Sequence, residues 1–375
     1  MRILHISSAR SLGGGERHLA GLVSALVARG HEVHVVLSPQ SPLAEELSAL
    51  PAAHILRVPL RNALDLKSAL ELARIVRERQ IELVHAHVAR DYPLAALAVR
   101  RVRGARLVIT RHVLFPLSRL HAVTLLHAAR VIAVSEAVAH RLNAQRIVPA
   151  CKLTVVPNGV DFSRFDDAAR EEQRASFRRS LGLRPESLLV GSVGELKREK
   201  GHDDFLRAAA SISRAAPDAE FVIAGADTSK SGEHLSALVK LAQQSGIGER
   251  VHFTGWLGDI APMLAALDLF VSASHTESFG LAIAEAMGSG LAVVSTATDG
   301  AREIITEGTG LLVPVGDAEA IAQAALKLLR NPEERQRLAA HARRSARQRF
   351  SLEQMVNATE QIYLGAITEG MKKEE

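Results

Sequence analysis

Short apolar runs alternate with longer amphipathic stretches from the first residue of the chain. In the first half the apolar runs are 3–7, 32–37, 54–58, 83–87, 107–110 and 131–134. Stretches with a helical spacing of apolar residues follow several of them, at 16–29, 42–50 and 65–79. Strands that alternate with helices of this length are typical of βαβ units, so the pattern predicts a parallel sheet.

A second series begins after a charged stretch. Its apolar runs are 188–193, 221–224, 251–254, 269–272 and 292–296, and each precedes a helical pattern. The final helical patterns, 319–330, 332–349 and 352–367, follow no further predicted strand. Pro157 and the pair Asn158 and Gly159 interrupt the pattern between the two series, which favours a hinge there.

We therefore predict two domains, 1–156 and 157–351, with a terminal helix at about 352–370 that crosses back to the first. Two doubly wound sheets of similar size would each bind ligands outside the carboxyl ends of their strands. If the sheets face each other, one cleft between them would hold the ligand.

The composition is that of a globular protein. No apolar run approaches the roughly 18 residues of a membrane-spanning helix, and the first residues form a strand pattern rather than a signal peptide, so we expect a cytoplasmic protein. The only cysteine is Cys151, which excludes intramolecular disulfides and cysteine-based zinc sites.

Charge is distributed unevenly along the chain. Residues 1–156 contain 21 Lys and Arg against 10 Asp and Glu, a net charge of +11, whereas the remainder has 25 against 31, or −6. Such a basic half suits a phosphorylated substrate or an anionic membrane surface, although solvated arginine-rich helix faces explain it equally well. Nucleic acid is disfavoured, because aromatic residues make up only 3% and no nucleic-acid-binding motif is present.

Glycines follow the first predicted strand. The sequence Gly13-Gly14-Gly15-Glu16 opens a helical pattern, where backbone N–H groups and the helix N-terminus can approach a phosphate. His18 stands at the third glycine position of a dinucleotide fingerprint, and the lysine of a P-loop is absent. The loop is thus either a phosphate cradle or a plain tight turn.

Cations follow the first strand of the second series. Lys197, Arg198 and Lys200 come soon after the run 188–193, and Lys200 is the preferred electrophile for a diphosphate leaving group. Because the chain contains no Asp-x-Asp pair, we predict that no metal ion bridges the diphosphate. A solvated charged turn is the alternative, and the position at a strand end favours function.

Two glutamates flank a glycine at a predicted helix start. Glu277 precedes Phe279 and Gly280, and Glu285 lies one to two turns into the helix. Carboxylates can accept hydrogen bonds from sugar and ribose hydroxyls, and Gly280 permits close approach to the first turn. With the cations described above, these residues outline a nucleotide-sugar site.

Histidines and arginines of the first half offer weaker signals. His85 and His87 point the same way on a strand and could bind a metal, but the sequence supplies no third ligand, so we interpret them as buried or cleft-lining histidines. Arg10, Arg17 and His18 could contact an anionic acceptor, with solvated helix positions as the alternative.

In combination, these motifs resemble the retaining glycosyltransferases of the GT-B fold, family 4 or group 1. The resemblance covers nearly the whole chain. It rests on Gly14-Gly15-Glu16, Thr110-Arg111-His112, Val156-Pro157-Asn158-Gly159-Val160-Asp161, Glu199-Lys200-Gly201, Phe253-Thr254-Gly255-Trp256 and the segment from Glu277 to Glu285 with Ala286-Met287-Gly288. The implied fold is α/β with two facing Rossmann-like, doubly wound domains: an acceptor domain at 1–156 and a donor domain at 157–351.

The family resemblance also implies roles for single residues. Lys200 would contact the donor diphosphate, Glu285 the ribose, Glu277 the transferred sugar, and His112 would lie near the anomeric carbon. The remaining implied donor contacts are the backbone of Phe279, Gly280 and Leu281, the base-pocket residues Thr254, Gly255 and Trp256, and Gly14 with Gly15 at the phosphates.

One position departs from the family pattern. Many members have an arginine five residues before the lysine, where this chain has Glu195. Lys197 or Arg198 could supply the second cation, or the donor preference could differ.

The expected activity is metal-independent, retaining transfer of a sugar from a nucleoside diphosphate to an acceptor hydroxyl, without a cofactor. A lipid-linked or phosphorylated glycan acceptor and peripheral contact with an anionic membrane would fit the basic first half. The alternatives are an epimerase or hydrolase of the same architecture, a small soluble acceptor, and a non-catalytic binding protein.

Overall fold

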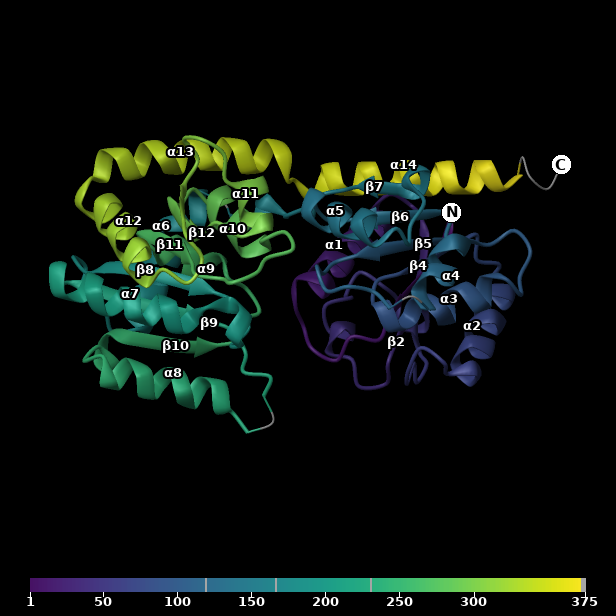
Figure 1. The fold of residues 1–375 in the computed structure, drawn as a ribbon, viewed down its shortest axis with the longest axis horizontal. Coiled ribbons are helices and arrows are strands. Elements are labelled where there is room, and N and C mark those ends of the chain that lie inside the picture. Colours follow the sequence, from purple (N-terminus) through teal and green to yellow (C-terminus); the bar gives the residue numbers. More distant parts are fainter. Residues whose placement is uncertain (119, 166, 230, 372–375) are drawn as a thin grey trace. The chain divides into compact units, whose positions relative to one another are not determined.

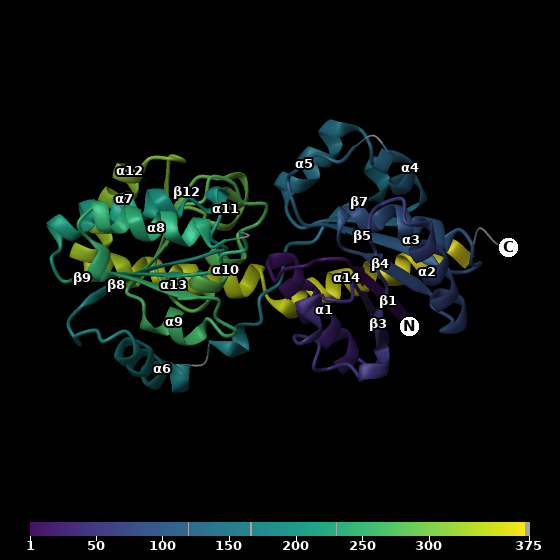
Figure 2. The same cartoon turned by 90° about the horizontal axis from the view of Figure 1, so that it is seen from below.

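The structure is a computed structural model that describes residues 1–118, 120–165, 167–229 and 231–371. It divides into two compact units: the first contains Met1–Gly159 and Leu352–Glu375, and the second contains Val160–Ser351. Each unit is a parallel sheet covered by helices on both faces (Figures 1 and 2). Within the described residues, no helix is both long enough and apolar enough to cross a membrane.

The first unit contains a seven-stranded sheet in the order β3-β2-β1-β4-β5-β6-β7, and all its pairings are parallel. Its strands are β1 (Arg2–Ser7), β2 (Glu32–Leu37), β3 (Ile55–Arg57), β4 (Leu83–Ala86), β5 (Arg106–Arg111), β6 (Arg130–Ala133) and β7 (Leu153–Val155). The chain winds outwards from β1 to β3, then returns to β4 on the other side of β1. The strand order therefore switches between β1 and β4, and ligands of doubly wound sheets bind at such a point.

Helices cover both faces of this sheet. They are α1 (Gly14–Ala28), α2 (Leu66–Glu78), α3 (Tyr92–Val99), α4 (Leu120–His127), α5 (Glu136–Gln145) and the C-terminal α14 (Leu352–Met371). The last helix belongs to this unit, since Tyr363 is fully buried there and Arg29 forms an ion pair of 2.7 Å with Glu360. An isolated helix of this composition would be marginal in water, so burial of its apolar face stabilises it.

The second unit contains a six-stranded sheet in the order β10-β9-β8-β11-β12-β13, again with parallel pairings only. Its strands are β8 (Leu188–Val193), β9 (Ala219–Ala224), β10 (Val251–Gly255), β11 (Leu269–Ser272), β12 (Val293–Thr296) and β13 (Leu311–Val313). Here the switch in strand order lies between β8 and β11. The strands are apolar on both sides because helices cover both faces of the sheet.

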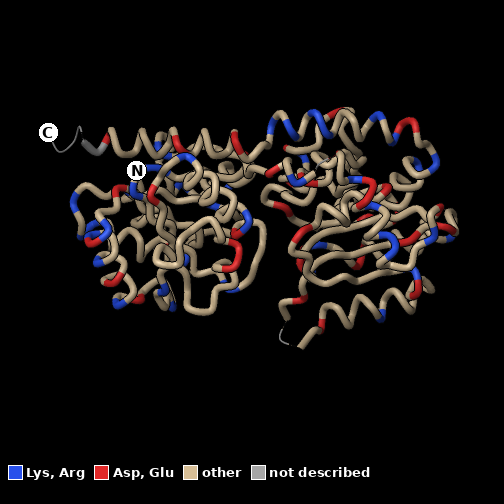
Figure 3. Tube along the Cα trace, turned by 180° about the vertical axis from the view of Figure 1, so that it is seen from behind, with Lys and Arg blue, Asp and Glu red and all other residues tan. Residues whose placement is uncertain are grey.

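The helices of the second unit are α6 (Asp167–Ser180), α7 (His202–Ala215), α8 (Glu233–Gln244), α9 (Ala261–Ala266), α10 (Leu281–Gly288), α11 (Asp299–Ile304), α12 (Ala318–Arg330) and α13 (Pro332–Arg349). α7 and α12 pack side by side on one face of the sheet, where Phe205, Phe221 and Ile321 belong to the buried core. Figure 3 shows Lys and Arg distributed over helices and connecting loops of each unit.

Two sequence-based element predictions are wrong. The stretch 42–50 forms only a short 3-10 helix at Pro42–Ala44, because it is bounded by Pro42 and Pro51 and packs through Leu43 and Leu47. The expectation that no strand follows 292–296 also fails, since β13 pairs with β12 at the sheet edge. Three residues with a half-exposed centre are too short to show a period-two pattern.

Candidate active site

The carboxyl ends of β8 and β11 bring together a lysine and a glutamate. Because β8 and β11 are parallel neighbours, the loops that follow them emerge at the same edge of the sheet. Lys200 Nζ lies 2.7 Å from Glu277 Oε1, which also accepts a 2.8 Å hydrogen bond from Ser274 Oγ. Both side chains are partly accessible, at 24% and 14%. One candidate from each of the two loops therefore takes part in the same ion pair.

Gly201 fixes the lysine turn against the glutamate loop. Its φ of 61° is left-handed, and a Cβ at this position would lie 2.0 Å from the carbonyl oxygen of Ala273. The His275 N–H donates a 2.8 Å hydrogen bond to the Glu199 carbonyl, which joins the same two loops. Lys200 is thus held beside Glu277 by backbone contacts as well as by charge.

The glutamate loop is packed against α11. The Gly300 N–H donates a 3.1 Å hydrogen bond to the Glu277 carbonyl, and a Cβ on Gly300 would lie 2.5 Å from the Phe279 carbonyl oxygen. Gly280, with a φ of 107°, precedes the first residue of α10, Leu281. The Phe279 side chain is buried against Phe350, so only its backbone can face a ligand.

Glu285 lies one turn into α10 and is only 6% exposed. Its position on the helix is fixed by the Ser289 N–H, which donates a 2.9 Å hydrogen bond to the Glu285 carbonyl. Carboxylates buried to this extent are rare in proteins unless they are paired or hydrogen-bonded.

The departure at Glu195 has a local explanation. Glu195 Oε2 lies 2.7 Å from Lys197 Nζ, and the Thr228 hydroxyl donates to Glu195 Oε1. Burial would raise the pKa of Glu195, but these hydrogen bonds outweigh it and hold the pKa below its ordinary value. Lys197 is therefore occupied by an acid of its own loop, whereas Arg198 is exposed to solvent.

The predicted base-pocket residues lie at the end of the edge strand β10. Gly255 has a φ of 69° and its carbonyl accepts a 2.9 Å hydrogen bond from the Gly225 N–H, while Thr254 Oγ1 donates to that same carbonyl. Trp256 is 40% exposed. They share the carboxyl edge of the sheet with Lys200, but β9 separates their strand from β8.

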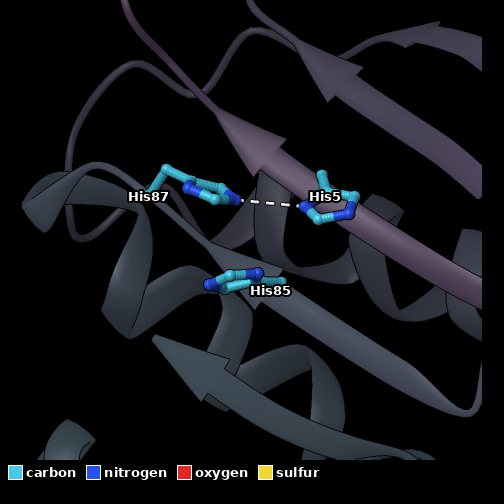
Figure 4. Close-up of side chains that lie close together, drawn as sticks. All are labelled: His5, His85 and His87. Carbon is cyan, nitrogen blue, oxygen red and sulfur yellow. Dashed lines mark hydrogen bonds between the residues drawn. The ribbon is translucent and has the colours of Figure 1, made fainter. Parts of the chain in front are cut away.

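Histidines gather at the corresponding edge of the first sheet. His5 Nδ1 on β1 lies 3.0 Å from Nε2 of His87, which follows β4 (Figure 4). His87 Nδ1 in turn lies 3.3 Å from Nε2 of His112, which follows β5. Gly15 adjoins them, because a Cβ there would lie 3.5 Å from the His112 ring. The glycine loop and His112 are therefore neighbours within the first unit.

This cluster extends one interpretation and corrects another, since His85 and His87 are buried as expected but His18 is not solvated. The third histidine that the sequence did not supply beside His85 and His87 is present in space as His5 (Figure 4). His18 is not a solvated helix residue, since it is only 3% exposed and its ring centroid lies 4.8 Å from that of His112. Arg10 is exposed, as a solvated residue should be.

Burial keeps the clustered histidines neutral. It lowers the pKa of His5 to about 3 and that of His18 to about 4. The pKa values of His85, His87 and His112 are also well below the ordinary value, mainly through burial and then through neighbouring histidines. At neutral pH these uncharged imidazoles can accept hydrogen bonds or bind ligands through lone pairs.

A cavity of about 340 Å³ lies at the opposite edge of the first sheet. It is lined in part by Arg106 and Arg130, the first residues of β5 and β6, and by Arg100, Arg103 and Lys152. None of the clustered histidines lines it. We therefore do not assign it to the active site.

Sequence reasoning missed Ser274, Thr228, His5 and the pairing of His18 with His112. Ser274 could have been found from its place beside Glu277 after an apolar run. The others depend on strand order, which one sequence does not reveal.

The two parallel α/β units are those of the GT-B fold. Two solved structures share this fold at a TM-score of 0.85: Anabaena Alr3699/HepE in complex with UDP and glucose, and a glycosyltransferase from Rickettsia africae ESF-5. Each is 22% identical to this chain. The similarity covers 96% of this chain for the Anabaena structure, 98% of it for the Rickettsia structure, and 98% of each solved chain. At this identity the likeness shows the fold.

The chain belongs to the group 1 glycosyltransferases. Residues 173–345 match the family model for glycosyl transferases group 1, and residues 12–164 match that for glycosyltransferase family 4. N-acetyl-alpha-D-glucosaminyl L-malate synthase of Bacillus anthracis is 26% identical over 94% of both chains. The lipopolysaccharide core biosynthesis glycosyltransferase LpsE of Rhizobium meliloti (strain 1021) is 28% identical over 96% of this chain and 98% of its own.

Proposed function

We propose that the protein is a retaining glycosyltransferase that moves a sugar from a nucleoside diphosphate sugar to an acceptor hydroxyl in cell-envelope glycan or glycolipid synthesis. The observation that carries this proposal is the contact between Lys200 and Glu277 at the switch point of the second sheet. A cation for phosphate and a carboxylate for hydroxyls, held side by side by fixed loops, match the two ends of such a donor. Similarity to enzymes with envelope acceptors, such as LpsE, supports the choice of pathway.

Donor binding would exchange the ion pair for contacts with the ligand. Lys200 Nζ, now paired with Glu277, would turn to a diphosphate oxygen and release the carboxylate to accept hydrogen bonds from the sugar. Glu285 would accept from the ribose, while the backbone at Gly280 and Leu281 would face the sugar and phosphate at the start of α10. Because each loop is already fixed, little ordering would accompany binding.

No metal bridge is part of this proposal. Asp203 and Asp204 are the acidic residues closest in sequence to Lys200 on its C-terminal side, and Arg207 donates hydrogen bonds of 2.9 and 2.7 Å to them. Asp204 also accepts from His275 at 2.7 Å. These carboxylates are therefore satisfied by side chains of their own unit. Activity that persists after exhaustive dialysis against EDTA would support the proposal, and loss restored by Mg²⁺ or Mn²⁺ would contradict it.

The chemical step would proceed on one face of the sugar. The bond between the anomeric carbon and the diphosphate oxygen breaks, the acceptor oxygen bonds to the same face of that carbon, and the acceptor proton passes to the departing diphosphate. Lys200 would stabilise the negative charge that develops on the leaving group. Glu277 and His112 would orient the sugar and stabilise charge, and no protein nucleophile is required.

A panel of donors tests the proposal. UDP-, GDP- and ADP-sugars would be screened by thermal shift, since a ligand that binds only the folded state stabilises it. The best donor would then be incubated with candidate acceptors, and the product's anomeric configuration read by NMR. We expect a product with the configuration of the donor. Inversion would contradict the mechanism, and an epimerised or hydrolysed sugar formed equally fast without acceptor would favour the epimerase or hydrolase alternative.

We further propose that the acceptor is membrane-borne and that the first unit docks on anionic lipid. Residues 1–156 carry a net charge of +11, and this unit also exposes several large apolar side chains after β5: Phe115 at 65%, Val123 at 60% and Leu126 at 57%. Exposed apolar groups beside cations are typical of surfaces that contact lipid headgroups.

Vesicle co-sedimentation tests this docking. Anionic vesicles at low salt should sediment the protein, neutral vesicles should not, and F115S together with L126S should reduce sedimentation. The exposed pair Leu64 and Leu66 of the same unit serves as a matched control when changed to serine. Absence of sedimentation with anionic vesicles would favour a small soluble acceptor.

A further inference from the structure

Three histidines of the first unit have ring nitrogens that lie close to one another. They are His18 on α1, His87 after β4 and His112 after β5, and one nitrogen of each lies within 4.8 Å of the others. His87 Nδ1 and His112 Nε2 are 3.3 Å apart. Two nitrogens at corners of a tetrahedron around Zn²⁺ are separated by roughly 3.3 Å when each bond is 2.0–2.1 Å. The observed spacing thus matches a shared metal ion as well as a weak hydrogen bond.

The same histidines leave ring nitrogens without ordinary hydrogen bonds. Among the described residues, the buried His18 makes no hydrogen bond of ordinary geometry, and its side-chain contact with Asn158 is a looser one. His112 Nδ1 and His5 Nε2 have no hydrogen-bond partner either. Buried polar atoms are almost always satisfied, so a group of orphaned nitrogens in one place needs an explanation. A bound cation would account for one nitrogen of His18, because it accepts a lone pair that no protein donor reaches.

We propose that His18, His87 and His112 form a binding site for a transition-metal dication such as Zn²⁺, oriented by His5 from behind His87. His87 would bind through Nδ1 and donate its Nε2 proton to His5 Nδ1, 3.0 Å away. A ligating histidine usually donates its second ring nitrogen in this way, which fixes its tautomer. Three nitrogen ligands leave a fourth position open for water or another ligand.

The electrostatics of the cluster suit a metal. A metal binds the neutral imidazole through a ring lone pair. His112 is only partly buried, which gives an ion a route from solvent. No carboxylate belongs to this group in the described residues, and imidazole nitrogens favour Zn²⁺, Cu²⁺, Ni²⁺ or Co²⁺ over Mg²⁺.

The neighbouring triad of His5, His85 and His87 is a weaker candidate. Its nitrogens also lie within 4.8 Å of one another. However, His85 already uses both ring nitrogens, in a 2.6 Å hydrogen bond with the Tyr363 hydroxyl and a 2.7 Å hydrogen bond with Thr110 Oγ1. A metal there would break one of these short buried contacts, whereas a metal on His18, His87 and His112 would replace only the 3.3 Å contact between His87 and His112 and the looser contact of His18 with Asn158.

The metal site does not depend on the proposed function, although it has a consequence for it. A metal ion on His112 would occupy the nitrogen that the glycosyltransferase proposal places near the sugar. Zn²⁺ would then inhibit transfer, and chelation would restore it.

The test uses full-length, tag-free protein dialysed against EDTA. Titration with Zn²⁺ in a calorimeter and with Co²⁺ in a spectrophotometer should show one equivalent bound, with visible Co²⁺ bands of a tetrahedral nitrogen site. His18→Ala should weaken binding by about 100-fold or more, and His112→Ala should do the same. His85→Gln and the exposed-residue control His127→Ala should retain wild-type affinity. Circular dichroism verifies that each variant folds.

Two outcomes would overturn the site. One is a Zn²⁺ and Co²⁺ response of the wild type no stronger than that of the His18→Ala variant. The other is binding that survives His18→Ala but disappears with His85→Gln, which would assign the metal to the neighbouring triad. Because both readouts measure binding without substrate, failure here leaves the proposed glycosyl transfer untouched.

Discussion

At the carboxyl edge of the first sheet, between β1 and β4, the side chains that meet are neutral imidazoles, whereas between β8 and β11 of the second sheet they are a lysine and a glutamate. The two positions are topologically equivalent, since each is the switch point of a doubly wound sheet. Glycines follow the first strand at each switch point, Gly13 to Gly15 after β1 and Gly194 with Gly201 after β8. The two sheets therefore have equivalent sites at their switch points, and only the side chains at these sites differ.

The two edges differ in the ligands that their side chains can bind. Lys200 and Glu277 keep part of their surface accessible, so a ligand with phosphate and hydroxyl groups can replace their mutual contact. The histidines are buried and uncharged, so they offer lone pairs to a proton, a sugar or a metal rather than charge to a diphosphate. Equivalent topology thus fixes the location of a site and leaves its chemistry to the side chains.

Removing the cation of the second edge should have the largest effect. We expect Lys200→Ala to lower kcat/KM for the donor by about 10²- to 10³-fold, because it removes one fixed group that stabilises the leaving diphosphate. Steady-state kinetics with the best donor measures this. Lys327→Ala is the matched control, since that exposed lysine pairs only with Glu334 at 3.1 Å among the described residues and should change kcat/KM little. Equal activity of both variants would remove Lys200 from the mechanism.

The buried histidines at the edge of the first sheet should make the free energy of unfolding depend on pH. Burial lowers the pKa of His18 to about 4 from 6.5, so the folded state resists protonation that the unfolded chain accepts. Its contribution to stability is complete above pH 6.5 and falls as the pH drops towards 4, by about 3 kcal/mol. Buried Asp91, with its pKa raised to about 6, acts in the opposite direction.

The variant His18→Gln isolates this effect. Urea unfolding between pH 4.5 and 7, with EDTA present, should show a slope against pH that is smaller by about one proton than that of the wild type. Parallel slopes for the two proteins would mean that His18 titrates normally in the folded state.

Sequence patterns predicted the second edge better than the first. Lys200, Gly201 and Glu277 lie in loops directly after apolar runs, so their meeting follows once two parallel strands are neighbours. His5, His18, His87 and His112 come from four segments, and they meet only because β1 lies between β2 and β4, with β5 next to β4. That order is a property of the whole sheet.

Short elements account for the other failures. β13 has three residues and lies at a sheet edge, where burial imposes little pattern. The stretch 42–50 has enough apolar residues for a helix, and Pro42 at its start would be tolerated in a first helical turn, but Leu43 and Leu47 pack into the core from a 3-10 turn and Pro51 ends the segment. Local composition described both poorly because tertiary packing decides their conformation.

Gly201 is needed both for its left-handed backbone and for its close contact with Ala273. A comparison with Gly182 separates these two reasons. Gly201→Ala introduces a Cβ into left-handed backbone and against the Ala273 carbonyl, 2.0 Å away. Gly182→Ala has the same backbone problem, with a φ of 68°, but no heavy atom within 4 Å. We expect the free energy of unfolding to fall by about 1 kcal/mol for Gly182→Ala and by about 2 kcal/mol more for Gly201→Ala. Equal losses in urea unfolding would show that the contact with Ala273 does not constrain the turn.

The smallest effect is expected at Glu195, which stands where many family members have an arginine. Glu195→Gln removes the charge that holds Lys197 at 2.7 Å and leaves the ammonium available to the donor. The donor KM should fall by up to about tenfold, with kcat nearly unchanged. An increased KM would instead show that Glu195 itself contacts the donor or positions the loop.

Calorimetric titration of UDP, GDP and ADP into the wild type, Lys200→Ala and Glu285→Gln tests the donor site most directly. The account predicts that at least one of the nucleotides binds the wild type and that each substitution weakens its affinity about tenfold or more, since each removes a charge-assisted hydrogen bond. Unchanged nucleotide affinity in both variants would contradict it.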